Sequence, residues 1–360
     1  MVCPMIDSAK TYKKITFSPQ MKKQWWILLL LGVALAGCNH KPGRVPEPAN
    51  GAYYWRTTLR LDSTERAFLA QHHVKKLFLR FFDLVPDGKG SIKPNATLRF
   101  ADSLPTGLEV IPTVFITENC MKARLDSIPR LLVERIAAMC EVNGIAPIKE
   151  VQLDCDWTAS SEAAYFGFLT QVRALLKEKG IRLSATIRLH QLRTAPPPVD
   201  YGALMLYNTG DATNRSCPNP ILDMAAVEPY LKHLASYQLP LCAAYPVFAW
   251  KLLFSGSTFK GIAYDANLAD TTLFLPKPDA TYLAVSCREL LAEADAANAT
   301  RIHPGDEILY RQVPFSLIET VSRRVEEFSP HMNEQVIIFD LNAENIRRYK
   351  FNEYEKIYRH

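Results

Sequence analysis

The sequence lacks the short motifs that mark several large enzyme classes. It contains no glycine-rich phosphate-binding loop, no Gly-x-Ser-x-Gly, no His-Glu-x-x-His and no cluster of histidines. Its 8 cysteines include no Cys-x-x-Cys pair and no zinc-knuckle spacing. These absences argue against a nucleotide-dependent enzyme, a serine hydrolase and a zinc enzyme, so we expect no metal and no cofactor.

The chain also lacks a strong excess of charge beyond its first segment. The formal net charge is +5, but much of the excess lies in the first 45 residues, at Lys10, Lys13, Lys14, Lys22, Lys23, Lys41 and Arg44. The rest of the chain is close to neutral and offers no electrostatic footprint for nucleic acid. With 360 residues, 48% of them hydrophobic, the chain is long enough for one large α/β domain.

The N-terminal segment has the pattern of an export signal. Lys22 and Lys23 precede an apolar run at 25–36, which ends in Leu35-Ala36-Gly37-Cys38. A short basic region, about a dozen apolar residues and a small-residue cleavage site indicate a secretory signal rather than a membrane span. Leu-Ala-Gly-Cys resembles the bacterial lipobox, and this resemblance implies that Cys38 is acylated and becomes the mature N-terminus.

The first 50 residues are therefore expected to lie outside the folded domain. We predict a signal peptide at 1–38, with a natural start at Met21, and an extended tether at 39–50, which contains three prolines. No second long apolar run follows. We expect a domain at 51–360 that is exported and held by lipid at a bacterial outer membrane.

The remaining cysteines are predicted from their surroundings. Cys140, Cys155 and Cys242 lie in apolar runs and are expected to be buried small hydrophobic residues. Cys217 lies in a predicted loop of an exported chain, where it is a candidate for a disulfide whose partner the sequence does not identify.

From residue 51 onward, predicted strands alternate with predicted helices. The strands are expected at 52–59, 74–83, 108–117, 150–156, 181–189, 201–207, 240–248 and 335–341. The helices are expected at 62–72, 127–143, 160–179, 221–237, 315–328 and 343–349. Strands that are mostly apolar are typical of a parallel sheet covered on both faces. Eight such units in about 300 residues predict an α/β fold of the (β/α)8 TIM-barrel type.

One segment does not follow this alternation. Residues 255–314 show little helical periodicity and contain the turn Pro304-Gly305-Asp306. The segment is too long for a plain loop. We predict an insertion between strands seven and eight that forms a small subdomain or a lid.

The most informative stretch is the fourth predicted strand, at 151–158. Side chains alternate between the two faces of a strand, so Asp154, Asp156 and Thr158 share one face. Two acids on one face of an otherwise apolar strand are costly to bury unless they are used or paired. A helical pattern follows directly, and the carboxyl ends of such strands are where α/β proteins place their sites.

Other strand ends supply residues for the same site. In a barrel these ends converge, and the candidates that they contribute are Tyr54, Arg80, Glu118, Arg188, Tyr207, Asn208, Tyr245, Trp250 and Asp340. Acids and an arginine flanked by aromatic rings are typical of a sugar site, because carboxylates accept hydroxyl hydrogen bonds and rings stack on sugars. The structural alternatives are an Asp156–Arg188 pair, packing roles for Tyr207 and Trp250, and a helix cap at Asp340.

The fourth strand resembles a known motif. Leu153-Asp154-Cys155-Asp156-Trp157-Thr158 is similar to the fourth-strand motif Asp-x-x-Asp-x-Asp-Trp-Glu of the chitinase-like glycoside hydrolases, with Asp154, Asp156 and Trp157 in matching places. Leu206-Tyr207-Asn208 resembles the sixth-strand Met-x-Tyr-Asp of that group, with Asn208 in the place of the acid. The layout also resembles uncharacterised bacterial glycosidase-like barrel lipoproteins. The resemblance implies a glycosidase-like barrel and a glycan as its ligand.

The departures from the motif decide what chemistry to expect. Val151 stands in the place of the first acid, and Thr158 in the place of the glutamate that protonates the glycosidic oxygen. A hydroxyl has no accessible acidic pKa and does not replace that group. Either Glu118 or Asp340 supplies the proton, or the site binds without cutting. Three hypotheses follow: a glycoside hydrolase with a non-standard acid, a non-catalytic glycan-binding lipoprotein, and a structural or assembly lipoprotein whose barrel contacts protein.

Overall fold

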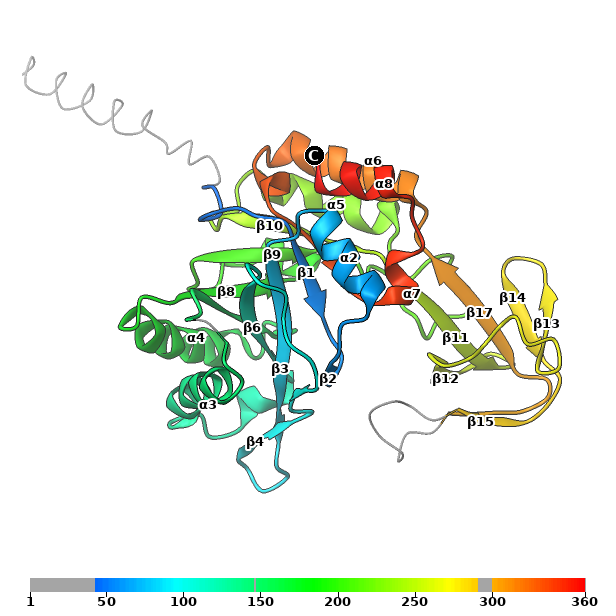
Figure 1. The fold of residues 1–360 in the computed structure, drawn as a ribbon, viewed down its shortest axis with the longest axis horizontal. Coiled ribbons are helices and arrows are strands. Elements are labelled where there is room, and N and C mark those ends of the chain that lie inside the picture. Colours follow the sequence, from blue (N-terminus) through cyan, green and yellow to red (C-terminus); the bar gives the residue numbers. More distant parts are fainter. Residues whose placement is uncertain (1–42, 146, 291–299, 360) are drawn as a thin grey trace, which may run out of the picture. The chain divides into compact units, whose positions relative to one another are not determined.

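A computed structural model describes residues 43–145, 147–290 and 300–359. Its main element is a closed barrel of parallel strands: β1 (Gly51–Tyr54), β3 (Lys76–Pro86), β6 (Glu109–Ile116), β7 (Glu150–Asp154), β8 (Arg182–Ile187), β9 (Tyr201–Met205), β10 (Leu241–Pro246) and β18 (Val336–Phe339). Neighbouring strands pair in chain order, and β1 pairs with both β18 and β3, which closes the ring (Figure 1). The predicted TIM barrel is therefore confirmed.

Helices cover the outside of this barrel. They are α2 (Ser63–Gln71), α3 (Ile128–Val142), α4 (Glu162–Lys177), α5 (Met224–Leu234), α6 (Phe315–Phe328), α7 (Ala343–Ile346) and α8 (Phe351–Tyr358). The predicted capping of α2 is present, since the Asp62 side chain accepts from the backbone of Glu65 and the Glu65 side chain accepts from that of Asp62. Two features were not predicted: a 3₁₀ turn, η2 (Leu189–Arg193), in place of a helix after β8, and the C-terminal α8.

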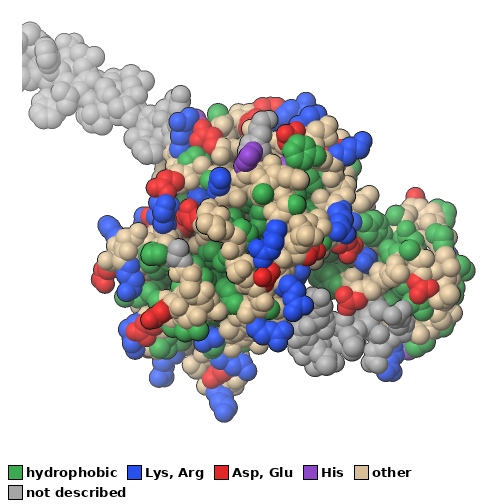
Figure 2. All heavy atoms as spheres, viewed as in Figure 1, with side chains coloured by type: hydrophobic (Ala, Val, Ile, Leu, Met, Phe, Trp, Pro, Cys, Tyr) green, Lys and Arg blue, Asp and Glu red, His purple; other side chains and the backbone are tan. Residues whose placement is uncertain are grey.

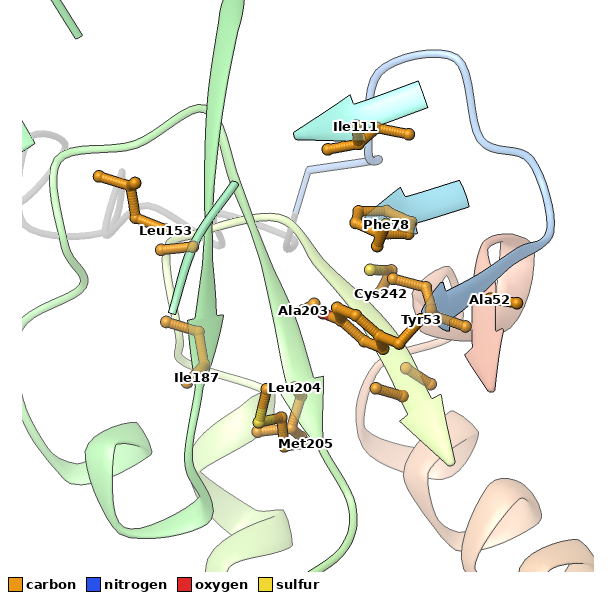
Figure 3. Close-up of a cluster of buried hydrophobic side chains, with 14 of the residues drawn as sticks. Ala52, Tyr53, Phe78, Ile111, Leu153, Ile187, Ala203, Leu204, Met205 and Cys242 are labelled. Carbon is orange, nitrogen blue, oxygen red and sulfur yellow. The ribbon is translucent and has the colours of Figure 1, made fainter. Parts of the chain in front are cut away.

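The barrel interior is filled by side chains from successive strands. The ring of Tyr53 packs against Phe78 at a centroid distance of 5.2 Å. Figure 3 shows these two rings beside Cys242 inside the barrel. Cys140, Cys155 and Cys242 are buried, as predicted, and all the cysteines in the described part of the chain are free thiols, Cys217 included. The barrel interior is thus a packed core, and a ligand site can lie only at an end of the barrel.

The predicted insertion is a β-structure. β12 (Thr258–Ile262), β11 (Ala249–Ser255), β17 (Glu307–Gln312), β14 (Thr281–Ala284) and β13 (Phe274–Lys277) form an antiparallel sheet in this order, and β15 (Arg288–Leu290) pairs with β16 (Thr300–Ile302). It lies between β10 and α6, as predicted, but begins at Ala249 rather than at residue 255. The reason is that the apolar run of β10 continues without a polar break into β11.

A second addition lies on the chain between β3 and β6. The predicted loop after the second strand contains β4 (Ile92–Asn95), which pairs antiparallel with the end of β3. It also contains β5 (Arg99–Phe100), which pairs with β2 (Thr58–Leu59). The carboxyl ends of the barrel strands are called the mouth below. The β3–β4 hairpin follows the carboxyl end of β3, and the insertion follows that of β10 (Figure 1).

The predicted tether is shorter than expected. Val45 is only 4% exposed, and Arg44 forms an ion pair with Glu334 at 3.0 Å, so the chain from Arg44 onward is docked on the folded unit. The predicted signal peptide, Cys38 and residues 39–42 lie outside the described residues. Within the described residues, no helix has the length and apolar character needed to cross a membrane.

Candidate functional site

Asp154 is the last residue of β7, on its inward face as the alternation predicts, and Asp156 follows the strand. Thr186 on β8 donates to Asp154 at 2.6 Å, from a neighbouring inward position. The opposite face packs outward: Cys155 is fully buried, and the indole of Trp157 meets the ring of Phe166 on α4 at 5.2 Å. Both faces of β7 are packed, and Asp154 stands at its carboxyl end. Asp154 therefore lies at the mouth.

Arg188 joins the two acids of the motif. Its Nε donates to Asp156 Oδ1, and its Nη2 lies 3.8 Å from Asp154 Oδ1. Burial raises the pKa of Asp154, and the Arg188 guanidinium opposes that rise. Burial acts to lower the pKa of Arg188, but the two carboxylates raise it above its ordinary value, so the guanidinium stays charged. The Asp156–Arg188 pair considered from the sequence is therefore present, and the side chain of Asp156 is still 54% exposed.

Thr158 and Glu118 form a second contact at the mouth. The Thr158 hydroxyl donates to Glu118 Oε1 at 2.5 Å, and Ser161 donates to the same oxygen at 2.8 Å. These hydrogen bonds hold the pKa of Glu118 below its ordinary value. Glu118 is therefore a carboxylate at neutral pH and has no proton to donate. Thr158, which stands in the proton-donor position of the motif, thus donates a hydrogen bond to Glu118, one of the two acids considered as a substitute donor.

Asp340 follows β18 and differs from the other acids. Burial raises its pKa to about 6, against a hydrogen bond from Asn345 Nδ2 at 2.5 Å. The helix cap considered for it belongs instead to Asn342, whose side chain accepts from the backbone of Glu344 at 2.8 Å. Asp340 is therefore a half-buried acid with a raised pKa.

Aromatic rings pack together beside these acids. Tyr207 stacks on Phe339 at 5.0 Å, and Trp55 and Phe248 contact Phe339 at 5.7 and 5.6 Å. Trp55 and Phe339 are only partly buried. Trp250, predicted at the end of strand seven, lies on β11 and contacts Phe248 at 5.4 Å. Burial raises the pKa of Tyr207 well above its ordinary value, and its hydroxyl has no partner among the described residues.

Arg80 is held at the edge of this aromatic cluster. It donates to both carboxylate oxygens of Asp83, at 2.8 and 2.5 Å, and to the Trp55 carbonyl at 3.2 Å. Its guanidinium carbon lies 5.5 Å from the centre of the Trp55 ring. The arrangement fixes the indole of Trp55 at the mouth.

Two of the predicted site residues lie outside the mouth, whereas Asn208 follows β9 at the mouth itself. Tyr54 points away from the barrel interior, because Tyr53 takes the inward position, and its hydroxyl donates to the Thr58 carbonyl at 2.7 Å. Tyr245 also faces outward, since Cys242 is inward, and donates to Asn333 at 2.7 Å. The prediction that Tyr54 and Tyr245 lie at the mouth was wrong, because each is one residue away from an inward-facing position on its strand. Asn208 is exposed beyond β9, with φ of 55°.

Sequence reasoning missed the rings that replace them. Trp55 and Phe339 are the mouth-facing aromatics of β1 and β18, where Tyr54 and Asp340 alone were selected. Trp55 lies two residues after Tyr53 and therefore on the same side, but the inward position of Tyr53 is visible only in the fold. No signal in the sequence marks Phe339.

A cavity adjoins the mouth on the side of the insertion. It has a volume of about 640 Å³ and is lined by residues of β11, β14, β17, the 264–268 turn and α7, which include Lys251, Tyr264, Tyr282, Tyr310 and Glu344. Tyr264 is 65% exposed, and Lys251 Nζ lies 3.6 Å from Glu344 on α7, the helix that follows Asp340. The insertion thus adds a tyrosine-lined groove next to the strand ends.

The surface mixes charges of both signs, and the described residues include no evident metal site. Lysine, arginine and acidic side chains are interspersed over the face shown in Figure 2. Among residues 43–145, 147–290 and 300–359, no group of three or more His, Cys, Asp or Glu side chains is placed to hold a metal ion.

Comparison with known proteins gives a result for the fold alone. No family model and no curated protein matches the chain. A chitinase from Chromobacterium violaceum has a similar structure, with a TM-score of 0.53 and 12% identity over 86% of this chain and 98% of that one. A class V chitinase from Pseudomonas fluorescens gives 0.52 and 14%, over 86% and 99%. The spore cortex-lytic enzyme SleL of Bacillus megaterium gives 0.51 and 12%, over 87% and 75%. The chain therefore has a glycoside hydrolase-like barrel fold.

Proposed function

We propose that this chain is a lipid-anchored lipoprotein that binds a glycan at its barrel mouth without hydrolysing it. The observation that carries the proposal is the pairing of Thr158 with Glu118. The position of the proton donor holds a hydroxyl, and the nearest substitute is an ionised carboxylate.

Asp154 and Asp156 fit hydrolysis poorly. Glycoside hydrolases place a protonated acid and a carboxylate about 5–10 Å apart across the scissile bond. Asp156 is occupied by Arg188, and Asp154 is 3% exposed and bonded to Thr186. A sugar that enters the mouth therefore meets Asp156, paired with Arg188, and Glu118, bonded to Thr158, as acceptors of hydrogen bonds from its hydroxyl groups.

Binding is favoured by the aromatic surface. Trp55 and Phe339 are partly buried rings at the mouth, and Tyr264 is an exposed ring in the neighbouring groove. Apolar faces of sugar rings stack on such side chains, while polar neighbours orient the hydroxyl groups. The mouth and the groove together offer several subsites, which suits an oligosaccharide better than a single sugar.

The first glycans to test come from the similar folds. Two of those proteins are chitinases and one is a spore cortex-lytic enzyme. Chitin oligosaccharides and bacterial cell-wall fragments are therefore the first ligand classes. Anchoring is proposed from the lipobox-like sequence at Cys38, with the bacterial outer membrane as the site, and mass spectrometry of the mature N-terminus tests it directly.

A glycan array followed by calorimetry tests the binding. We expect wild type to bind an oligosaccharide, and Trp55→Ala and Tyr264→Ala each to weaken affinity about tenfold, the loss of one stacking contact. Phe351→Ala is the matched control, because Phe351 is a 50% exposed ring on α8, outside the mouth. Absence of any glycan ligand, or equal losses in all three variants, would reject the proposal and favour a protein partner.

The raised pKa of Asp340 favours one second candidate. A carboxyl with a pKa of about 6 is suited to general acid catalysis near neutral pH. In that case the chain is a hydrolase with Asp340 as proton donor. Release of reducing ends by wild type, with loss of that release in Asp340→Asn and retained binding, would establish this function instead.

A further inference from the structure

The segment that leads into the barrel is docked at one end of it. Arg44 forms an ion pair with Glu334 at 3.0 Å and donates to His331 at 3.2 Å. Val45 is buried, and Glu47 lies 3.4 Å from Arg182. Several independent contacts thus fix residues 44–47 on the surface.

These contacts identify which end of the barrel is involved. Glu334 precedes β18, and Arg182 is the first residue of β8. In a parallel barrel, the residues that precede the strands all lie at the amino-terminal end, opposite the mouth. In Figure 1 the chain enters at the end from which the β1 arrow points away. The chain therefore reaches the fold at the face farthest from Asp156 and Trp55.

The length of chain before this dock limits how far an anchor can lie. Residues 39–43 separate Cys38 from Arg44. Six virtual bonds between these two residues span at most about 20 Å when fully extended. An acyl chain on Cys38 therefore keeps the amino-terminal end of the barrel close to the lipid surface.

We propose that the amino-terminal end of the barrel faces the bilayer and that the mouth points away from it. The inference rests on the proposed acylation of Cys38. Its consequence is a restriction on the ligand: the mouth receives glycans from the space beyond the membrane and not the headgroups of the lipids that hold the anchor. The docked segment acts as the orienting element, because a free tether of twelve residues would allow the barrel to tumble.

Two exposed lysines on either side of β3 provide a matched pair of reporters. Lys75 precedes the strand at the amino-terminal end, and Lys89 follows it in the β3–β4 turn at the mouth. The strand has 11 residues, so in a tilted barrel the two positions differ in height by about 30 Å. Lys75→Cys and Lys89→Cys are labelled with a fluorophore in full-length protein in which Cys217 and Cys287, the described cysteines that are not buried, are replaced by serine.

The acylated proteins are incorporated into phosphatidylcholine vesicles that carry nitroxide groups on their lipid headgroups. We expect several-fold stronger quenching at position 75 than at position 89. Inserting about ten Gly-Ser residues between Gly43 and Arg44, or replacing Arg44 and Val45 by alanine and aspartate, should reduce this difference. Equal quenching, or stronger quenching at position 89, overturns the proposed orientation.

Failure of the proposed orientation can be distinguished from failure of the proposed glycan binding. A mature N-terminus without an acyl group, with no flotation on vesicles, overturns both the anchoring and the orientation. Glycan binding by the same preparation in solution reports on the mouth alone. Acylation with equal quenching overturns the orientation only.

Discussion

The two ends of the barrel both hold a basic side chain and an acid of β7, yet only one of them is open to a ligand. At the amino-terminal end, Lys76 donates to Gln335, and Tyr201 and Ser184 donate to Glu150; the Lys76 and Glu150 side chains are 1% and 0% exposed. At the mouth, the Asp156 side chain is 54% exposed although Arg188 holds it. A basic and an acidic side chain inside a barrel therefore do not identify a site by themselves, because a site also needs access for a ligand.

The largest effect is expected at the closed end. Glu150→Ala removes the acceptor of Tyr201 and Ser184 and leaves Lys76 with less compensation in the interior. We expect a loss of about 3–5 kcal/mol in the free energy of unfolding, measured by urea denaturation. Glu150→Gln keeps the shape and should cost less. A loss below about 1 kcal/mol for the alanine variant would contradict the structural role assigned to this end.

Removing the cation at the mouth should have a smaller effect. Arg188→Met leaves Asp154 buried beside Asp156 without its guanidinium, and we expect a loss of about 2–3 kcal/mol at pH 7. The control is Arg173→Met, because Arg173 pairs with Asp200 on the surface with 43% of its own side chain exposed. That variant should lose less than about 1 kcal/mol. Equal losses would show that the mouth pair is no more than a surface contact.

Asp340 predicts a pH dependence with a definite sign. Burial raises its pKa from 3.8 to about 6, so between these values the folded protein holds a proton that the unfolded chain has released. Stability contributed by this group is present below about pH 4 and is lost as the pH rises through about 6. Between pH 4 and pH 7, Asp340→Asn should therefore gain about 2 kcal/mol relative to wild type. Urea denaturation at several pH values measures this gain. Parallel stability curves would refute it, and Asp126→Asn, at an exposed carboxylate, is the control that should run parallel.

The smallest effect is expected at the exposed member of the pair. Asp156→Asn should change the free energy of unfolding by less than about 1 kcal/mol, because solvent screens an exposed carboxylate. The same substitution should weaken glycan binding, because the Asp156 side chain is exposed to a ligand at the mouth. A variant that is strongly destabilised but binds with unchanged affinity would reverse the contrast between the two ends.

The sequence was sufficient for the barrel because its strands are nearly continuous apolar runs with helical patterns between them. It was also sufficient for the inward position of Asp154, and it offered the Asp156–Arg188 pair as one of two alternatives, since both follow from the alternation along adjacent strands. It was not sufficient where a run of apolar and aromatic residues shows no alternation, as at Tyr54 and Tyr245, whose hydroxyls bond to groups outside the barrel. A single inward contact, such as Tyr53 with Gln152, decides that parity and is visible only in the fold.

Other features depend on contacts between distant residues. The docking of Arg44 on Glu334 joins residues 290 positions apart, and no local pattern predicts it. Phe339 became part of the site because Tyr207 and Trp55 pack on it from other strands. The start of the insertion at Ala249 was hidden for a different reason, since β10 and β11 form one apolar run.

The most direct test of binding without cutting is a time course on the oligosaccharide that wild type binds most tightly. The glycan is incubated with a stoichiometric amount of protein, and mass spectrometry follows its length and its reducing ends. Because Thr158 stands where the donor is needed and Glu118 is ionised, we expect the glycan to be recovered intact, at the same level as without protein. Shortened products that accumulate with time, and that disappear in Asp340→Asn, would contradict the central claim.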